Sequence, residues 1–286
     1  MEHRRLGRTE HRSTVAILGG AAFARAAAEQ TAEGFAEALA RGVNHLDIAP
    51  QYGDAEVLVG PLLPPVRDRL FVACKTLRKN PAGVRAQAEE SLERFGTDYF
   101  DLYQMHAVTD LDVLETRVDA AAEILKMREE GITRFAGITG HNEQAPGAFL
   151  EALRRWDIDT VMFPVNARMW ADADYRRDAE ELLEVCAERD LGVMAIKAAA
   201  RRPWDDSERF ATTWYEPYSE PEDLSRGIAF TLSVPGVHAF CTPGDLKYLR
   251  FALDAADVFA PLDERERDAA ISEASALPTI FPIPAA

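Results

Sequence analysis

The sequence has few cysteines and no long apolar run. The three cysteines, Cys74, Cys186 and Cys241, are widely spaced and lie in apolar stretches, which excludes a disulfide framework and a zinc motif with paired ligands. No stretch approaches the roughly 20 consecutive apolar residues that span a bilayer. The first residues are charged and carry no apolar core, so no signal peptide is expected. These absences predict a cytoplasmic protein in a reducing compartment.

Basic residues are also in short supply, since 32 Lys and Arg stand against 48 Asp and Glu and give a net charge of −16. An acidic surface repels phosphate, which argues against nucleic acid and against anionic membrane surfaces as partners. A small ligand is not excluded, because a local basic pocket can lie inside an acidic protein. We therefore expect a small-molecule partner, and the sequence gives no indication of the oligomeric state.

The sequence does contain a repeated pattern of short apolar runs, each followed by a longer amphipathic segment. The amphipathic pattern is clear where Val84, Ala88, Leu92 and Phe95 fall on one face of a helix over 83–96. The repeat continues without a linker, so we predict one domain over residues 1–286. Eight runs are each long enough for one buried strand, at 15–20, 43–49, 70–75, 99–106, 134–139, 160–165, 191–197 and 237–242.

Another absence decides how these strands are arranged. An open doubly wound sheet normally has a G-x-G-x-x-G turn after its first strand, and LGGAAFA has only Gly19 and Gly20. Eight strand–helix repeats instead favour a closed (β/α)8 TIM barrel. The segment 198–220 follows the seventh strand and is too long for an ordinary connection, so we expect a functional loop there.

Glycines and acids mark the expected helix ends. Gly96, Gly131 and Gly192 fall just past predicted helices, where a left-handed residue often ends the helix. A last helix is expected to begin at Asp263, because Glu266 follows three residues later and forms a capping-box pattern.

Polar residues close three neighbouring strands of the predicted barrel. Asp47 ends the second strand, Lys75 the third and His106 the fourth, and Tyr52 lies in the loop after Asp47. The carboxyl ends of the strands in such a barrel form one rim, which is where its chemistry takes place. Each residue alone is more often a solvated or packed group, but four of them at one rim favour a functional site.

These four residue types fit the reduction of a carbonyl group. A phenol such as Tyr52 can supply the proton, and a nearby ammonium such as Lys75 stabilises the phenolate and lowers its pKa from about 10. A carboxylate paired with that ammonium, here Asp47, keeps it charged and oriented. An imidazole such as His106 can hydrogen-bond to the substrate oxygen.

At these residues the sequence resembles the aldo-keto reductase family. LGRTEHRSTVAILGGAAF resembles the opening hairpin and first strand of that family, and NHLDIAPQYGDAEVLVG, LFVACKT and FDLYQMH carry its Asp, Tyr, Lys and His. The resemblance implies a (β/α)8 barrel with a short N-terminal β-hairpin and an extra C-terminal helix and tail. It also implies NADPH as the cofactor, with NADH not excluded, and hydride transfer to a small aldehyde or ketone substrate.

The same resemblance implies a set of cofactor contacts. GITGHN (137–142) resembles the family's strand-five segment, where a small hydroxyl residue contacts the nicotinamide. The chain departs from the family pattern at Met162, Ile196 and Asp245, and Arg201 and Arg202 are candidates to replace missing phosphate ligands. The expected cofactor-binding residues are Gly20, Ala21, Asp47, Thr139, Gly140, Asn166, Lys197 and Thr242.

Three alternatives remain open at this point. The departures from the family pattern also suit a nucleotide-binding barrel with little turnover, such as a sensor. His45, Asp47 and His106 could form a metal site for hydrolysis, although Lys75 would place a positive charge beside the metal. The aromatic residues of the long loop either line a substrate pocket or pack the loop down; they are Trp204, Trp214, Tyr215 and Tyr218.

Overall fold

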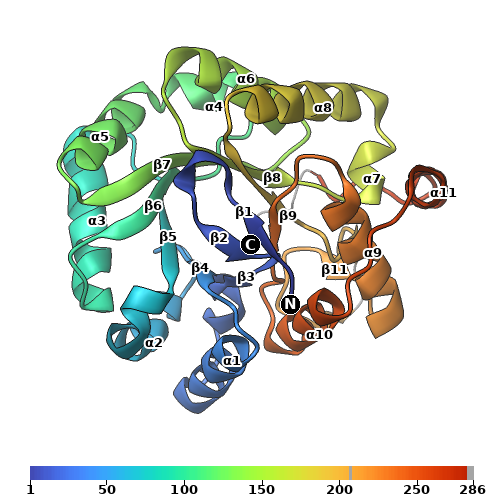
Figure 1. The fold of residues 1–286 in the computed structure, drawn as a ribbon, viewed down its shortest axis with the longest axis horizontal. Helices are drawn as coiled ribbons and strands as arrows, with labels where there is room; N and C mark the ends of the chain where they lie inside the picture. Colours follow the sequence, from blue (N-terminus) through green and yellow to red (C-terminus); the bar gives the residue numbers. More distant parts are fainter. Residues whose placement is uncertain (206–207, 282–286) are drawn as a thin grey trace.

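The computed structural model describes residues 1–205 and 208–281 and contains a closed barrel of parallel strands. The strand order around the barrel is β12-β3-β4-β5-β6-β7-β8-β9, so the predicted (β/α)8 barrel is confirmed and each of the eight predicted runs supplies one strand (Figure 1). The barrel strands are β3 (Ala16–Gly19), β4 (His45–Asp47), β5 (Phe71–Thr76), β6 (Phe100–Met105), β7 (Thr133–Thr139), β8 (Thr160–Pro164), β9 (Gly192–Ile196) and β12 (Ala239–Cys241).

The expected N-terminal hairpin is present and lies across one end of the barrel (Figure 1). It consists of β1 (His3–Arg5) and β2 (Arg12–Thr14), which pair antiparallel. Leu6, between them, is fully buried and packs with the side chains inside the barrel. Gly7 has φ +51, and a Cβ there would lie 2.3 Å from the carbonyl carbon of Leu191, so the hairpin turn approaches the barrel at backbone distance.

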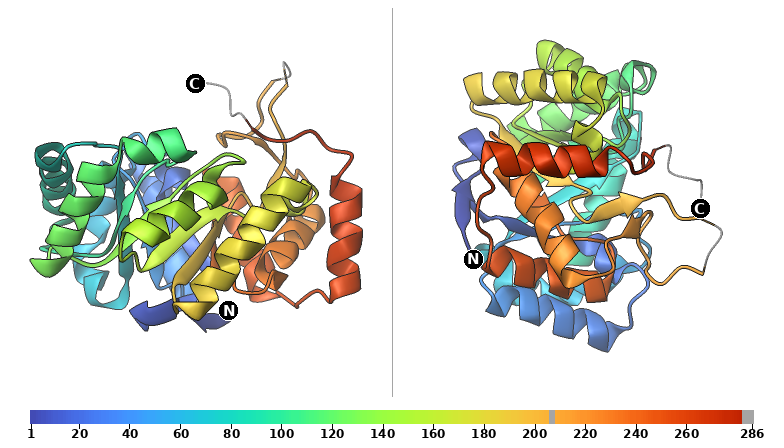
Figure 2. Two further views of the ribbon diagram at one scale, coloured as in Figure 1. Left: turned by 90° about the horizontal axis from the view of Figure 1, so that it is seen from above. Right: turned by 90° about the vertical axis from the view of Figure 1, so that its right-hand side faces the viewer.

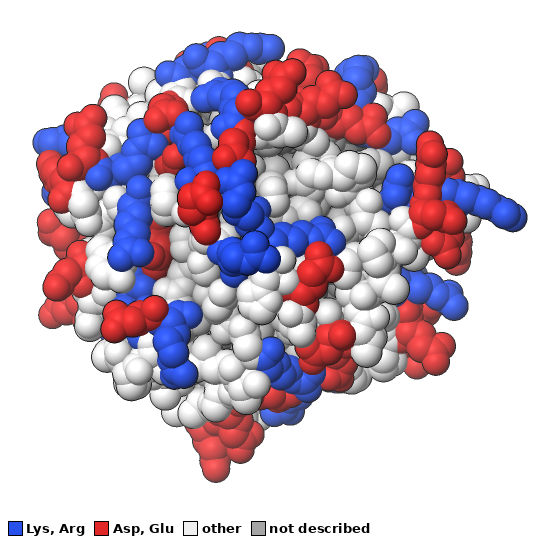
Figure 3. Space-filling model, viewed as in Figure 1, with Lys and Arg blue, Asp and Glu red and all other residues white. Residues whose placement is uncertain are grey.

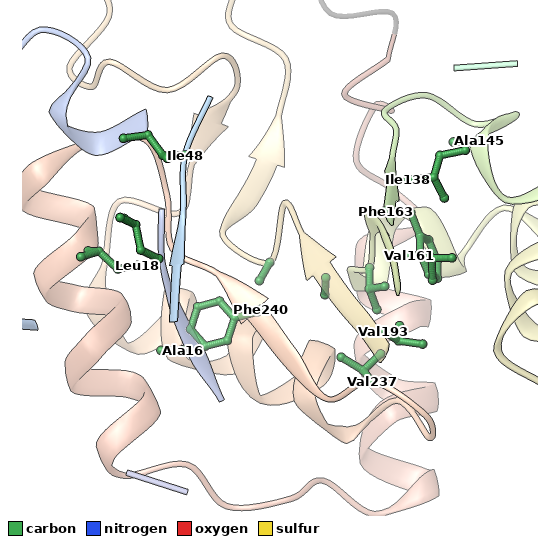
Figure 4. Close-up of a cluster of buried hydrophobic side chains, with 14 of the residues drawn as sticks. Ala16, Leu18, Ile48, Ile138, Ala145, Val161, Phe163, Val193, Val237 and Phe240 are labelled. Carbon is green, nitrogen blue, oxygen red and sulfur yellow. The ribbon is translucent and has the colours of Figure 1, made fainter. Parts of the chain in front are cut away.

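The helices form an outer ring that buries the outward-facing side chains of the strands. Figure 4 shows part of this outer layer, in which Leu18 lies close to a helix. A smaller cluster, with Phe71 and Met194 among its members, fills the barrel interior. The helices are α1 (Ala28–Ala40), α2 (Ala55–Val59), α3 (Pro81–Phe95), α4 (Leu111–Glu115), α5 (Val118–Glu129), α6 (Ala145–Arg155), α7 (Ala167–Trp170), α8 (Ala173–Glu188), α9 (Pro221–Ser233), α10 (Leu246–Asp257) and α11 (Glu264–Ala274).

Most helix ends follow the sequence signals. Gly96 and Gly131 have φ values of 60° and 80° and follow α3 and α5, as predicted. The prediction for Gly192 is wrong: it lies in β9, and the left-handed residue after α8 is Asp190, with φ 54°. A Cβ on Gly192 would lie 2.7 Å from Cγ of Leu6, so this glycine makes room for the hairpin. The capping box at Asp263 is confirmed at the start of α11.

The expected long loop and the C-terminal segment both project from the end of the barrel opposite the hairpin (Figure 2). Within the loop, β10 (Ala200–Arg202) pairs antiparallel with β11 (Glu216–Pro217). After α11, which contacts α7 and α9, the chain returns to the barrel mouth and buries Ile280 and Phe281. Pro282 and Pro284 of the tail lie outside the described residues.

Charged side chains of both signs are interspersed over the face that carries the hairpin (Figure 3). Several are paired, as in the ion pair of Arg5 with Asp190 at 2.6 Å and that of Arg8 with Asp157 at 2.6 Å. Across residues 1–205 and 208–281, no helix combines the length and apolar character needed to cross a membrane.

Candidate active site

The four residues predicted from the strand ends meet at one rim of the barrel. Asp47 ends β4, Lys75 is the next-to-last residue of β5, and His106 directly follows β6. Tyr52 lies in the turn between β4 and α2, and its backbone N–H donates to the carbonyl of Ala49 at 3.0 Å. Parallel pairing of β4, β5 and β6 holds the first three side chains at one level of the barrel.

Asp47 and Lys75 form a buried ion pair at the centre of this group. Nζ of Lys75 lies 2.5 Å from Oδ2 of Asp47, and the two side chains are 1% and 2% exposed. Nε2 of Gln104 donates to the other carboxylate oxygen at 3.3 Å, and the lysine also donates to the carbonyl of Ile48 at 3.3 Å. Burial alone would lower the pKa of Lys75, but Asp47, Tyr52 and Cys241 together raise it above its ordinary value. Lys75 is therefore a fixed ammonium.

The phenol of Tyr52 is hydrogen-bonded to this ammonium. Nζ of Lys75 donates to the Tyr52 hydroxyl at 3.3 Å and lies 5.0 Å from the centre of its ring. Burial raises the pKa of Tyr52 to about 12, although Lys75 acts in the opposite direction. Lys75 acts on the Tyr52 pKa in the expected direction, but desolvation of the phenolate outweighs the ammonium, so the pKa is raised overall. At neutral pH Tyr52 is a protonated donor.

His106 lies beside the tyrosine with its ring plane nearly perpendicular. The ring centres are 5.9 Å apart at 88°, and Nδ1 of His106 lies 3.1 Å from Oε1 of Gln51. Burial lowers the pKa of His106 well below its usual range, and the positive charge of Lys75 adds to this effect. The imidazole is therefore neutral. The guanidinium of Arg117 donates to the His106 carbonyl at 3.2 Å and fixes the backbone there.

Two neighbouring hollows open at this rim. The larger has a volume of about 440 Å³, and the narrower, of about 50 Å³, runs from Tyr52 toward the start of α10. Tyr52, His141, Lys197 and Trp214 line both of them. Another hollow, of about 450 Å³, lies on the outside of the barrel between α8, α9 and α11, remote from these four residues. Chemistry rather than size therefore identifies the site.

The narrow hollow contains five of the eight residues predicted to contact a cofactor, which are Ala21, Asp47, Thr139, Lys197 and Thr242. The other three residues do not line this hollow and instead pack against neighbouring protein atoms. A Cβ on Gly20 would lie 2.7 Å from Ile48, and one on Gly140 would lie 2.0 Å from the Val108 carbonyl oxygen. Asn166 is buried, caps α7 and donates to the Lys197 carbonyl at 3.1 Å. Gly19, one residue before the predicted Gly20, lines the hollow instead.

The loop aromatic residues divide between the two roles left open by the sequence. Trp214 lines both hollows, and Tyr215 lines the narrow one. Trp204 is buried, and its ring N–H donates to the Thr213 carbonyl at 2.7 Å. Tyr218 packs against the core.

The arginines proposed as phosphate ligands are engaged elsewhere. Arg201 and Arg202 bind the two carboxylate oxygens of Glu216, at 2.7 and 2.8 Å. Asp245 caps α10 and also accepts hydrogen bonds from Thr212, so the acid ties the long loop to the helix.

No group of three or more His, Cys, Asp and Glu side chains that could hold a metal occurs in the part of the chain that the structure describes. His45 instead packs inside the far end of the barrel, where its ring lies 4.7 Å from that of Phe71 and its Nδ1 lies 3.0 Å from the Ser13 hydroxyl. Cys74 is buried and points away from the rim, with Sγ 3.6 Å from a carboxylate oxygen of Glu56.

Four residues at the site were missed by the sequence reasoning. Gln51 contacts His106, Gln104 contacts Asp47, and Sγ of Cys241 lies 3.7 Å from Asp47. The fourth, His141, lies 6.0 Å from the His106 ring and lines both hollows. Gln104 and Cys241 could have been found as side chains in or at the end of barrel strands. Gln51 and His141 lie in loops, where strand periodicity gives no signal.

Comparisons with known proteins agree with this geometry. The family model "Aldo/keto reductase family" matches residues 16–202. The uncharacterized oxidoreductase YqkF of Bacillus subtilis is 27% identical over 77% of this chain and 80% of its own length. D-threo-aldose 1-dehydrogenase of Pseudomonas sp is 27% identical over 64% of each chain.

Solved structures share the fold. An aldo-keto reductase from Bacillus halodurans superposes with a TM-score of 0.71 at 22% identity, covering 97% of this chain and 98% of the other. An aldo/keto reductase from Klebsiella pneumoniae, in complex with NADP and acetate, gives a TM-score of 0.69 at 22% identity and covers 96% and 95% of the two chains.

The family uses NAD(P)H, so a nicotinamide cofactor is confirmed at that level. Membership also favours an oxidoreductase over a binding protein with little turnover and over a metal-dependent hydrolase. From the matched residues, the closed barrel and the four side chains at its rim, we conclude that the chain belongs to the aldo/keto reductase family.

Proposed function

We propose that this protein reduces an aldehyde or ketone to the alcohol, with NADPH as hydride donor and Tyr52 as proton donor. The observation that carries the proposal is the hydrogen-bonded series Asp47–Lys75–Tyr52, with contacts of 2.5 and 3.3 Å. When bound, the nicotinamide supplies the hydride. All other parts of the proposed mechanism belong to side chains of this chain.

The proton moves from the Tyr52 hydroxyl to the carbonyl oxygen. Its pKa of about 12 keeps the phenol protonated until the oxygen gains negative charge. The phenolate that remains is stabilised by the ammonium of Lys75, 3.3 Å away, and Asp47 keeps that ammonium charged and in place. Both partners are already positioned, so little reorganisation is needed as charge develops.

His106 orients the carbonyl group. A neutral imidazole donates from one nitrogen and accepts at the other, and contact of Nδ1 with Gln51 fixes which ring edge faces the pocket. Gln51 thus acts as a positioning residue for His106. The amide of Gln51 can present either its oxygen or its NH2 group, and the NH2 orientation leaves Nε2–H free to donate to the substrate.

The narrow hollow is the candidate cofactor site, because it begins at Tyr52 and is lined by residues that we expect to contact the cofactor. Ala21, Thr139 and Thr242 would hold it, and a Cβ on Gly19 would lie 2.5 Å from the Thr242 carbonyl oxygen, so the backbones approach closely there. Trp214 and Tyr215 of the long loop form part of the wall of this hollow. Titrating the protein with NADPH and separately with NADH determines which is preferred.

The substitution Tyr52→Phe tests the proposal. It removes the proton donor and should lower kcat/KM for a reactive aldehyde by about 100-fold or more, while the quench or enhancement of NADPH fluorescence on binding persists. The matched control is Tyr103→Phe, because Tyr103 is fully buried in the outer core and lines neither hollow among the described residues. Normal turnover by Tyr52→Phe would assign the proton to another group. Cofactor binding without reduction of any aldehyde, ketone or sugar by the wild type would overturn the proposal as a whole.

A further inference from the structure

Lys197 is the second buried lysine at the rim, and it lies opposite Lys75. It follows β9 directly and has φ +66, a left-handed backbone conformation that is uncommon for a residue with a side chain. Its side chain lines both hollows together with Tyr52 and Trp214. The chain therefore places this amine in the pocket and not in solvent.

The amine of Lys197 lacks the partner that a buried charge normally has. The residue is 7% exposed, and within residues 1–205 and 208–281 its Nζ makes no hydrogen bond or ion pair. Its contacts are the ring faces of Trp214 and Tyr215, whose centres lie 5.2 and 4.9 Å away. Aromatic faces attract a cation but do not neutralise it. Ammonium groups in largely buried residues are normally paired with an anion, and the hollow beside Lys197 has room for one.

The larger hollow has the charge that an anion requires. Its lining includes the cation Lys197 and the polar side chains of His106, His141 and Asn142, and it includes no Asp or Glu among the described residues. Nδ1 of His141 is buried and has no hydrogen-bond partner in the part of the chain that the structure describes. This composition stands out in a chain whose net charge is −16. The pocket is thus locally favourable to negative charge within an acidic protein.

We propose that the substrate carries an anionic group, such as a carboxylate, in addition to its carbonyl, and that Lys197 binds this group and selects for it. The inference rests on the proposed function, because the carbonyl is placed at Tyr52. The Trp214 ring lies 6.0 Å from the Tyr52 ring and 5.2 Å from Nζ of Lys197. Both binding points therefore lie beside one indole ring, which suits an oxo acid with a short spacer.

The ionisation of the surrounding groups gives this preference a pH dependence. Burial lowers the pKa of Lys197 to about 8, and Cys241 on β12 acts in the opposite direction. Burial also lowers the pKa of His106 and lowers that of His141 to about 3, so both are neutral. Burial raises the pKa values of Cys241 and Tyr215 above their ordinary values. Between about pH 6 and 9, Lys197 is therefore the group in this set that changes charge.

The test compares 4-oxobutanoate with its methyl ester, two aldehydes of nearly equal length that differ in charge. The measured quantity is the ratio of kcat/KM for the acid to kcat/KM for the ester, in which effects on folding and on the cofactor cancel. Lys197→Met should lower this ratio by about 10- to 100-fold, and Lys197→Arg should retain most of it. In the wild type the ratio should fall as pH rises through about 8, and in Lys197→Met it should not.

Lys247→Met is the matched control. Lys247 also lies over two aromatic rings, those of Tyr248 and Phe251 at 5.4 and 5.5 Å, but it is exposed on α10 and outside both hollows. Its substitution should leave the ratio unchanged. An unchanged ratio in Lys197→Met would overturn the inference, and so would an equal loss for both aldehydes together with weaker NADPH binding, which would assign the lysine to the cofactor.

Failure of the proposed function is recognised separately. If the wild type reduced neither these two aldehydes nor any other aldehyde, ketone or sugar, carbonyl reduction would be the part in error, and succinate would then serve as the probe. Its binding is followed by tryptophan fluorescence in the wild type and in Lys197→Met. Weaker binding in the variant supports Lys197 as the anion site, and equal affinity overturns it.

Discussion

Two lysines stand on opposite sides of the same rim, and their surroundings give them opposite properties. Lys75, on β5, is 2.5 Å from a carboxylate, and its pKa is raised. Lys197, after β9, is held between two aromatic rings of the long loop, and its pKa is lowered to about 8. Both side chains are buried, at 1% and 7% exposure, so depth of burial does not distinguish them. The direction of the pKa shift depends on the neighbouring groups. Lys75, paired with a carboxylate, can stabilise the charge that develops on Tyr52, whereas Lys197, beside aromatic rings, can bind an anionic ligand.

The largest effect is expected on the β5 side. Lys75→Met removes the ammonium and leaves Asp47 buried without its ion-pair partner, which should cost about 3–5 kcal/mol of the free energy of unfolding. It should also lower kcat/KM by about 100-fold or more, because the phenolate of Tyr52 loses its stabilising charge. Urea denaturation and aldehyde-reduction assays measure the two effects. A stable and active variant would show that the ion pair is dispensable.

The same substitution at Lys197, on the opposite side of the rim, should change the free energy of unfolding in the opposite direction. Lys197→Met removes an unpaired buried ammonium, so it should raise the free energy of unfolding at pH 7 by about 1–3 kcal/mol. In the folded state the lysine loses its proton near pH 8, below the unfolded value of about 10.5, so the gain should shrink as pH rises between these values. Denaturation at pH 7 and pH 10 measures this difference. Destabilisation at pH 7 would mean that Lys197 has a stabilising partner.

The histidine beside Lys197 adds a pH dependence at the acid end. Burial lowers the pKa of His141 to about 3, so the folded state binds its proton less readily than the unfolded state, whose value is about 6.5. Stability should therefore fall as pH drops from about 6.5 toward 3, by about 1–2 kcal/mol between pH 7 and pH 5 from this residue. His141→Asn should show a shallower fall. His11, whose pKa burial lowers to about 4, remains in the variant and should keep part of the slope.

The smallest effect is a difference in chemical labelling. At pH 8 about half of Lys197 is unprotonated, whereas Lys75 remains an ammonium. An amine-directed reagent small enough to enter the pocket should label Lys197 at least severalfold faster than Lys75, as read by peptide mass spectrometry. Labelling should slow when pH is lowered to 6. Equal labelling of both lysines would remove the contrast between the two sides of the rim.

The barrel and the four rim residues were predictable because each depends on local pattern. A buried parallel strand is a continuous apolar run, and a polar residue that closes it must reach the rim. For the same reason Asp47, Lys75 and His106 could be placed on neighbouring strands before any contact was known. The helical segment over 111–129, in contrast, is divided into α4 and α5. Arg117 lies at the break and donates to the carbonyls of Leu77 and His106. The spacing of apolar residues gives no sign of these hydrogen bonds.

The rest of the site depends on contacts between distant segments. The isolation of Lys197 arises because Trp214 and Tyr215 fold back over it, and the engagement of Arg201 and Arg202 arises from Glu216 across a bulged pair of strands. The direction of the Tyr52 pKa likewise required its burial to be known. Sequence spacing shows which groups are available, whereas desolvation and pairing emerge only once the chain is folded.

The N-terminal hairpin closes the end of the barrel that lies opposite the active site. Leu6 fills the barrel interior together with Phe71, at the end opposite the rim that carries the ion pair of Asp47 and Lys75. Deleting the first fourteen residues should therefore expose the barrel interior to water and raise the dielectric constant around the ion pair. Catalysis should weaken, although no hairpin atom contacts the catalytic side chains.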